Sequence, residues 1–371
     1  MKARIWAIFL SVTLGISPAL TLHAQEAAKD DPIDASVKRG VAYLMSVQNA
    51  EGAYLDPERG NQYSSVMSAL AVLSMASVGH QPTDKTPEGL SLRKGIDFLL
   101  RADRQRPDGY FGNTDSSRMY GHGIITLALC EMLGMGVDAS QDKLLRERCQ
   151  KSIELILRSQ RVKKHSPRFD GGWRYTPESG DADLSVTIWQ LLSLRSAKNA
   201  GLAVPKEAID SAVEYLKQSY KSERDANGLP TNMRSGFAYQ PGGSPEFATT
   251  AAGLLALQIC GEYNAPEVIG SSDWLLDMTT GGGPRKHRIQ YSQRWFFYGL
   301  YYFSQGMQKR GGVYASEAKS IVEKMLITNQ QQDGSWISGD GQERNAGKVY
   351  STSLAILCFA VKYHYLPIYQ N

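Results

Sequence analysis

A single unit recurs along this chain, and it constrains the fold more than any other feature. The unit begins with a helical stretch that has basic, small and aromatic–aliphatic positions, as in residues 39–44 and 94–99. A glutamine follows, and then a glycine close to an aromatic residue: Gln48 with 52–54, Gln105 with 109–111, Gln160 with 171–173 and Gln330 with 334–336. A unit that recurs along a chain in this way is typical of proteins built from stacked helix pairs.

A second, more apolar helix follows each loop. These helices are expected to start where an aromatic residue or leucine precedes a small residue: Tyr63-Ser64, Tyr120-Gly121, Leu184-Ser185, Phe247-Ala248, Tyr291-Ser292 and Tyr350-Ser351. Small residues suit a helix start, and apolar residues then recur at steps of three and four. The glycine of each unit is expected to end the first helix in a left-handed conformation.

One helix pair cannot bury its apolar face alone, so the pairs must stack. The apolar second helices are expected to form an inner ring, and the first helices, which are richer in lysine and arginine, an outer one. Neither end of the chain carries a polar capping repeat, which favours a closed ring over an open solenoid. The sequence therefore predicts an all-α protein, an α6/α6 toroid of six helix pairs, with residues 36–371 as a single domain.

The first residues have the order of a secretory signal peptide. Lys2 and Arg4 precede an apolar run over residues 5–20, and Ala24 offers a small residue for cleavage. A membrane anchor is the alternative, but the run is short and contains polar residues. We expect a signal peptide over residues 1–24, a short linker over 25–35, and an exported protein, periplasmic or extracellular, that has no transmembrane segment after cleavage.

Charge and cysteine content argue against a nucleic-acid-binding protein and against a metal-binding protein. The formal net charge of +4 gives no electrostatic case for nucleic acid. The cysteines, Cys130, Cys149, Cys260 and Cys358, have no CxxC spacing, so we expect buried thiols and neither a metal site nor a cofactor.

The repeat resembles that of squalene–hopene cyclases and protein prenyltransferase β subunits. Residues 171–175 (GGWRY), 183–187 (DLSVT), 350–354 and 365–369 are similar to exported bacterial members of that group. The resemblance covers residues 36–371 and implies an α6/α6 toroid with the inner-helix N-termini gathered at one mouth. It is specific for the fold and says little about activity.

The resemblance places Asp183 where class II terpene cyclases have their proton donor. Those enzymes use an Asp-x-Asp-Asp motif, whereas this chain has Asp181, Ala182, Asp183 and Leu184, so one carboxylate is replaced. Such cyclases also hold substrate between two barrels, and this chain has one. Two aspartates near a helix start can equally serve the helix terminus.

Other activities of similar folds fit less well. The zinc ligands of prenyltransferases have no counterpart here, and Cys260-Gly261-Glu262-Tyr263 lacks the glutamine that a thioester needs. A glycosidase would require two carboxylates across a cleft, for which Asp181, Asp183 and Glu246 are available, although solvated loop carboxylates explain them as well.

Aromatic residues are the strongest remaining signal. The run 291–303 is rich in aromatics, and several predicted helix starts carry one. We expect a ligand surface at the mouth or lumen from Tyr63, Tyr120, His122, Trp173, Tyr291, Arg294, Trp295 and Tyr350. Packing between the rings is the alternative for the aromatics, and a hydrogen-bonded structural histidine the alternative for His122.

Two hypotheses follow for the function. The first is a binding protein of the cell envelope that holds an isoprenoid, another lipid, a glycan or a protein partner and lacks an intact catalytic motif. The second is a terpene-cyclase-like enzyme with Asp183 as the acid and Asp181 beside it.

Overall fold

The structure is a computed structural model that describes residues 31–281 and 288–370. Over these ranges the regular secondary structure is helical, with isolated bridges in place of strands. The expected signal peptide lies outside the described residues. The first helix, α1 (Pro32–Ser46), begins inside the stretch expected to be linker.

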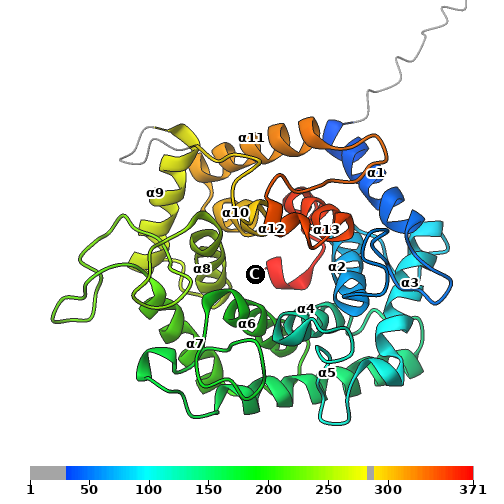
Figure 1. Ribbon diagram of the computed structural model, residues 1–371, viewed down its shortest axis with the longest axis horizontal. Helices are drawn as coiled ribbons and strands as arrows, with labels where there is room; N and C mark the ends of the chain where they lie inside the picture. Colours follow the sequence, from blue (N-terminus) through cyan, green and yellow to red (C-terminus); the bar gives the residue numbers. More distant parts are fainter. Residues whose placement is uncertain (1–30, 282–287, 371) are drawn as a thin grey trace, which may run out of the picture. The chain divides into compact units, whose positions relative to one another are not determined.

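The helices form two concentric rings (Figure 1). The inner ring contains α2 (Ser64–Ser77), α4 (Arg118–Glu131), α6 (Leu184–Asn199), α8 (Phe247–Ile259), α10 (Phe296–Arg310) and α13 (Lys348–Phe359). The outer ring contains α1, α3 (Pro87–Leu100), α5 (Ala139–Gln160), α7 (Lys206–Ser219), α9 (Pro266–Thr280) and α11 (Gly312–Asn329). A single turn, α12 (Gly341–Arg344), precedes α13. The predicted fold and the predicted assignment of first and second helices to the two rings are confirmed.

The burial pattern explains which helices lie inside. Every residue of α2 and of α8 is buried, because each inner helix is surrounded by its ring neighbours and its outer partner. The outer helix α7 instead buries one stripe, which includes Ile209, Val213 and Leu216 at steps of four and three. A helix that is apolar all round can be stable only when it is covered on all sides.

The ring is closed between the first and last repeats. Helix α13 packs against both α1 and α2. Where α11 ends, the amide of Gln330 donates to the carbonyl oxygens of Ser36 (2.9 Å) and Gly334 (2.9 Å). An open solenoid would leave these first and last elements apart.

The same bond recurs at other joints of the ring and explains the repeated glutamine. Gln48 donates to Gly52 and Ser91, Gln105 to Gly109 and Arg148, and Gln160 to Gly171 and Ala208. Each glutamine therefore fixes its own loop and ties that loop to the next outer helix.

The repeated glycine has a different role from the one expected. It does take a positive φ, for example +94° at Gly52, but α1 ends at Ser46, several residues earlier. A Cβ at Gly52 would lie 2.2 Å from the carbonyl oxygen of Lys94 in the next outer helix. Glycine is therefore required where the loop touches the neighbouring repeat, and it does not cap its own helix.

A C-terminal segment fills the ring where the inner helices finish, and aromatic side chains extend the filling to the second turns of α6 and α10. The short helix η4 (Pro367–Tyr369) lies within the ring in Figure 1. Its Ile368 donates its backbone N–H to the buried carboxyl of Glu131, 3.2 Å away. The hydroxyls of Tyr369 and Tyr301 are hydrogen-bonded, and Tyr301 stacks on Trp189 with ring centroids 6.0 Å apart. Space for a ligand must therefore be sought at the opposite end.

No helix among the described residues is long and apolar enough to cross a membrane.

Candidate ligand site at the mouth of the ring

The N-terminal ends of the inner helices are joined by bonds from the loop of the following repeat. Asp115 accepts from Val66 N at the start of α2, and Glu343 accepts from Phe297 N and Tyr298 N at the start of α10. Asp56 likewise accepts from Val349 N at the start of α13. Backbone carbonyls accept the corresponding bonds at α4 and α6. Met119 N donates to the carbonyl oxygen of Tyr175, and Leu184 N donates to that of Tyr239. These bonds gather the helix starts at one mouth and satisfy N–H groups that a helix leaves open.

Asp183 differs from those capping carboxylates because it caps its own helix. Its Oδ1 accepts from Val186 N at 2.9 Å, and its side chain is completely buried. Its Oδ2 is buried and ion-paired with Nε of Arg174 at 3.2 Å, and the Tyr239 hydroxyl also acts on this carboxyl. The buried carboxylate is therefore held by the start of its own helix and by side chains around the mouth.

Arg174 joins the two aspartates of the predicted motif. Its Nη1 donates to Asp181 Oδ2 at 2.8 Å, while its Nε faces Asp183. Burial raises the pKa of Asp183 to about 6, and the Val186 N–H, the Arg174 guanidinium and the Tyr239 hydroxyl act in the opposite direction. The ion pair therefore favours the ionised carboxylate at neutral pH.

Tyrosines surround this ion pair. The hydroxyls of Tyr175 and Tyr239 are hydrogen-bonded, and the guanidinium of Arg174 lies 4.7 Å from the ring centroid of Tyr175 and 5.7 Å from that of Tyr239. Tyr120, in the first turn of α4, stacks on Tyr175 at 6.0 Å. Tyr298 of α10 is buried, and its hydroxyl has no hydrogen-bond partner among the described residues.

The pKa values of two tyrosines at the mouth are raised by burial and by the charged and polar groups near them. The pKa of Tyr120 is raised well above its usual value, by burial first and then by Asp183, Tyr298, Tyr239 and Tyr175. The pKa of Tyr350 is also raised, by burial first and then by Glu343 and Tyr298. Tyr298 thus connects Tyr120 with Tyr350.

Tyr120 and Tyr350 are enclosed by protein and yet keep part of their surface accessible. Their raised pKa values report the surrounding protein, whereas their partial accessibility reports space next to the rings. Both side chains are therefore half-buried at the mouth. We call Tyr120, Tyr175, Tyr239, Tyr298 and Tyr350 the mouth tyrosines.

Several other predicted residues lie around repeats five and six or at helix starts. Tyr291 donates its hydroxyl to Ile337 O at 2.7 Å, and Trp295 donates its backbone N–H to Asp340. Tyr63 precedes α2 and, like Trp295, has a left-handed backbone. Arg294 is exposed, 3.9 Å from Glu246.

His122 and Trp173 lie between the two rings. The Nδ1 of His122 accepts from Phe111 N (3.3 Å), and its Nε2 donates to Ser152 O (3.2 Å). Its complete burial lowers its pKa to about 4, which keeps the imidazole neutral. Trp173 is buried and donates Nε1 to Ile156 O at 2.9 Å. Both side chains use their polar atoms to join helices and offer none to a ligand.

Sequence reasoning did not select Arg174, Tyr175 or Tyr239 as site residues. A signal was present, because a glycine, an aromatic residue, any residue and a tyrosine recur at 172–175 and 236–239. Tyr298 was within the aromatic run but was not distinguished from its neighbours. Among the described residues, no group of three or more His, Cys, Asp or Glu is arranged to hold a metal ion. The four cysteines are free thiols, three of them buried.

Comparison with known proteins places the fold in a class. No protein-family model matches this chain, and neither does any curated protein. Among solved structures, a variant of the type II terpene cyclase MstE from Scytonema in complex with geranylgeranyl dihydroxybenzoate is 14% identical. The match has a TM-score of 0.55 and covers 91% of this chain and 98% of that chain.

A second similar structure is an inactive variant of the GH76A α-1,6-mannanase of Salegentibacter sp. HEL1_6 in complex with α-1,6-mannotriose. It is 11% identical, with a TM-score of 0.60, and the match covers 90% of this chain and 99% of that chain. Identities this low show the fold alone. The protein is an α/α toroid of the kind shared by terpene cyclases and GH76 enzymes.

Proposed function

We propose that this protein is a ligand-binding toroid of the cell envelope that holds an isoprenoid-like chain among the mouth tyrosines. One observation carries the proposal: Tyr120, Tyr175, Tyr239 and Tyr298 gather around the ion pair of Arg174 with the buried Asp183, at the start of the inner helices. The structurally similar terpene cyclase binds a geranylgeranyl compound, which agrees with this ligand class.

The state of the hydroxyl groups favours an apolar ligand. Tyr175 and Tyr239 bond each other, and the hydroxyl of Tyr350 donates to Glu343 at 3.4 Å. These three residues therefore offer ring faces more than free hydroxyls, and ring faces suit the alkenes and methyl groups of an isoprenoid. A glycan, such as the mannotriose of the similar mannanase, would need more unsatisfied hydrogen-bonding groups.

Intrinsic tryptophan fluorescence tests the choice between these ligands. We expect geranylgeraniol to change the emission saturably and α-1,6-mannotriose to leave it unchanged. Tyr120→Leu should weaken the response, because it removes a stacked ring from the mouth. Tyr365→Leu, at an exposed tyrosine, is the matched control and should bind like the wild type. Saturable binding of mannotriose alone would overturn the isoprenoid assignment.

A second candidate function is proton transfer by Asp183. The complete burial of this carboxyl, which raises its pKa to about 6, supports it. The ion pair with Arg174 opposes it, because a carboxylic acid that protonates an alkene must first hold the proton. Incubation with a linear isoprenoid in D2O tests this function. Deuterium-labelled cyclic product that disappears in Asp183→Asn would establish it, and unchanged substrate would leave binding as the function.

Export is part of the proposal and has its own test. Sequencing the N-terminus of protein isolated from its cells should find cleavage after Ala24, with Gln25 as the first residue. A mature protein that still begins at Met1 would contradict export through this segment.

A further inference from the structure

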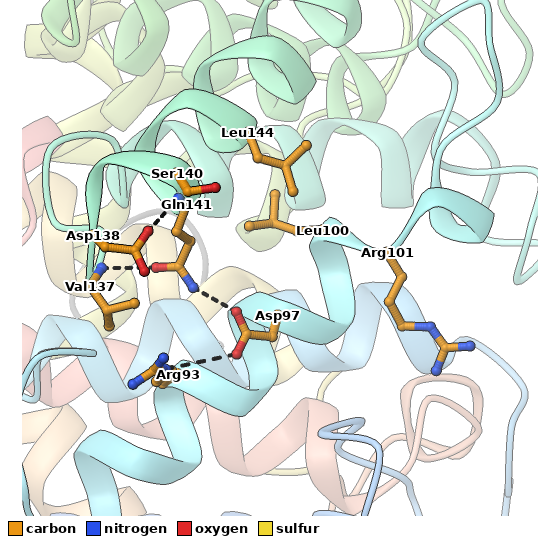
Figure 2. A pocket seen from close by; sticks show the side chains of 9 residues that line it. All are labelled: Arg93, Asp97, Leu100, Arg101, Val137, Asp138, Ser140, Gln141 and Leu144. Carbon is orange, nitrogen blue, oxygen red and sulfur yellow. Dashed lines mark hydrogen bonds and ion pairs between the residues drawn. The ribbon is translucent and has the colours of Figure 1, made fainter.

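Two hollows outside the mouth are candidates for a second ligand site. The smaller one, with a volume of about 360 Å³, lies between α3 and α5 (Figure 2). Its polar groups are satisfied internally, since Gln141 donates to Asp97 at 2.6 Å and accepts from Val137 N at 3.0 Å. Asp138 caps α5. This hollow presents little free hydrogen-bonding capacity to a ligand.

The larger hollow is a cleft of about 690 Å³ with a different chemistry. It lies between the loop 106–118, the end of α5 and residues 176–178, and it contains Arg106, Arg118 and Arg158. We call it the arginine cleft. Two acidic residues, Asp108 and Glu178, also line it, so these five charged side chains leave a formal excess of one positive charge.

The three arginines differ in how many of their N–H groups already bind other residues of the protein. Arg106 is paired with Asp108, with 3.3 Å between Nη2 and Oδ2. Arg158 donates Nη2 to the backbone oxygen of Asp108 at 2.8 Å, which leaves its other N–H groups free to bind. The exposed guanidinium of Arg118 has no ion pair or hydrogen bond within residues 31–281 and 288–370.

The backbone holds Arg118 in an unfavourable conformation. Its φ is +56°, and that of Ser116 is +64°, both in the left-handed region that residues with a side chain rarely adopt. Arg118 N donates to Gly112 O at 2.8 Å, and a Cβ at Gly112 would lie 1.8 Å from the oxygen of Arg118. Asp115 secures the same loop through its bond to Val66 N. The strained loop is therefore fixed, and strain that is kept in this way is often associated with a binding function.

We propose that the arginine cleft binds a phosphate group through Arg118 and Arg158. Guanidinium groups present paired N–H donors that match phosphate oxygens, and the excess positive charge suits an anion. The phosphate could be free, or it could be the head of an amphiphile. For the second source, the chain of the amphiphile would have to extend from the cleft to Tyr120, which stacks on Tyr175 at the mouth. The assignment of an amphiphile rests on the function proposed for the mouth, whereas binding of free phosphate does not.

Isothermal titration with inorganic phosphate at constant ionic strength tests the site. Wild type should bind, and Arg118→Gln and Arg158→Gln should each weaken binding about tenfold or more, because each removes charge-assisted hydrogen bonds. Arg101→Gln is the matched control, since this exposed arginine lines the smaller hollow and is paired with Glu51 and Asp103. Equal melting temperatures would show that the variants are folded. No binding by wild type, or an equal loss in Arg101→Gln, would overturn the proposal.

Titration with octyl phosphate distinguishes the two sources. Tighter binding than inorganic phosphate, with the gain lost in Tyr120→Leu, would identify an amphiphile whose chain enters the mouth. Equal binding would identify free phosphate or a small phosphate ester as the ligand. Failure of geranylgeraniol to bind would refute the function proposed for the mouth and leave the phosphate result standing.

Discussion

The amide nitrogen of Gln330 lies 2.9 Å from the carbonyl oxygen of Ser36, although the two residues are 294 positions apart in the chain. The side-chain oxygen of Gln330 also accepts from the Ser36 hydroxyl at 2.7 Å. This pair joins the last outer helix to the first, and its counterparts at Gln48, Gln105 and Gln160 join consecutive repeats. The ring is therefore closed by the same interaction that builds it.

The first prediction concerns this closure. Gln330→Ala should lower the free energy of unfolding by about 2–3 kcal/mol, because it leaves partly buried carbonyl groups without donors. Gln331→Ala removes a neighbouring exposed glutamine and should change it by less than about 0.5 kcal/mol. Urea denaturation of both variants checks the difference. Equal stabilities would mean that the Gln330 bonds contribute nothing to closure.

The second prediction concerns the glycine at each joint. Gly334→Ala should destabilise the protein by more than about 2 kcal/mol, because the added Cβ would lie 2.3 Å from Arg39 O and the φ of Gly334 is +86°. Gly228→Ala has a comparable φ of +76° but no atom within 4 Å of the added Cβ. It should therefore cost only about 1 kcal/mol. Thermal denaturation separates the steric contribution from the backbone contribution.

The third prediction follows from the raised pKa of Asp183. Burial moves this pKa from 3.8 to about 6, so the folded state binds the proton more tightly than the unfolded state. Protonation of Asp183 therefore contributes about 3 kcal/mol to the free energy of unfolding. This contribution is fully present below pH 3.8 and is lost as the pH rises through about 6.

The measurement is the free energy of unfolding from pH 4 to pH 8 for wild type and for Asp183→Asn. The difference between the two curves removes the contribution of Glu131, whose pKa is raised to about 7 by burial. The wild-type value should fall relative to the variant as the pH rises. A constant difference, or one of opposite slope, would show that the carboxyl titrates near its ordinary pKa.

The fourth prediction concerns the strained arginine at the start of α4. Arg118→Gly should be more stable than Arg118→Ala by about 1 kcal/mol, because glycine adopts the φ of +56° without steric cost. This order is the reverse of that for an ordinary helix position. Melting temperatures of the two variants give the comparison, and a more stable alanine variant would show that the backbone relaxes at this position.

The ring architecture could be predicted from the sequence because each repeat carries the same local requirements. The glutamine and the glycine recur at matched positions at four joints, because those joints share the same two bonds and the same close approach. The inner helices could be recognised because residues that are buried on all faces, as in α2 and α8, must be apolar all round.

The mouth could be predicted only in part. Asp183 and Asp181 were selected because they resemble the acidic motif of class II terpene cyclases, and Tyr120 because it lies at a predicted helix start. Arg174 and Tyr239 come from loops of different repeats, and nothing local indicates that both reach Asp183. His122 also starts an inner helix, but its side chain points between the rings, where Phe111 and Ser152 bond it. The direction of a side chain depends on the neighbouring repeat, and sequence spacing does not contain it.

The filled end of the ring was a further feature that spacing could not supply. Tyr369 lies far from Tyr301 and Trp189 in the chain, and only the closed ring brings them together. The expected lumen is therefore restricted to the mouth.

Native mass spectrometry of the protein purified from its own cells, followed by lipid extraction, tests the central claim most directly. We predict a bound isoprenoid or a closely related lipid that wild type and Tyr365→Leu retain and that Tyr120→Leu loses. Protein that carries no ligand, or that carries an oligosaccharide unaffected by Tyr120→Leu, would contradict the assignment of the mouth tyrosines as an isoprenoid site.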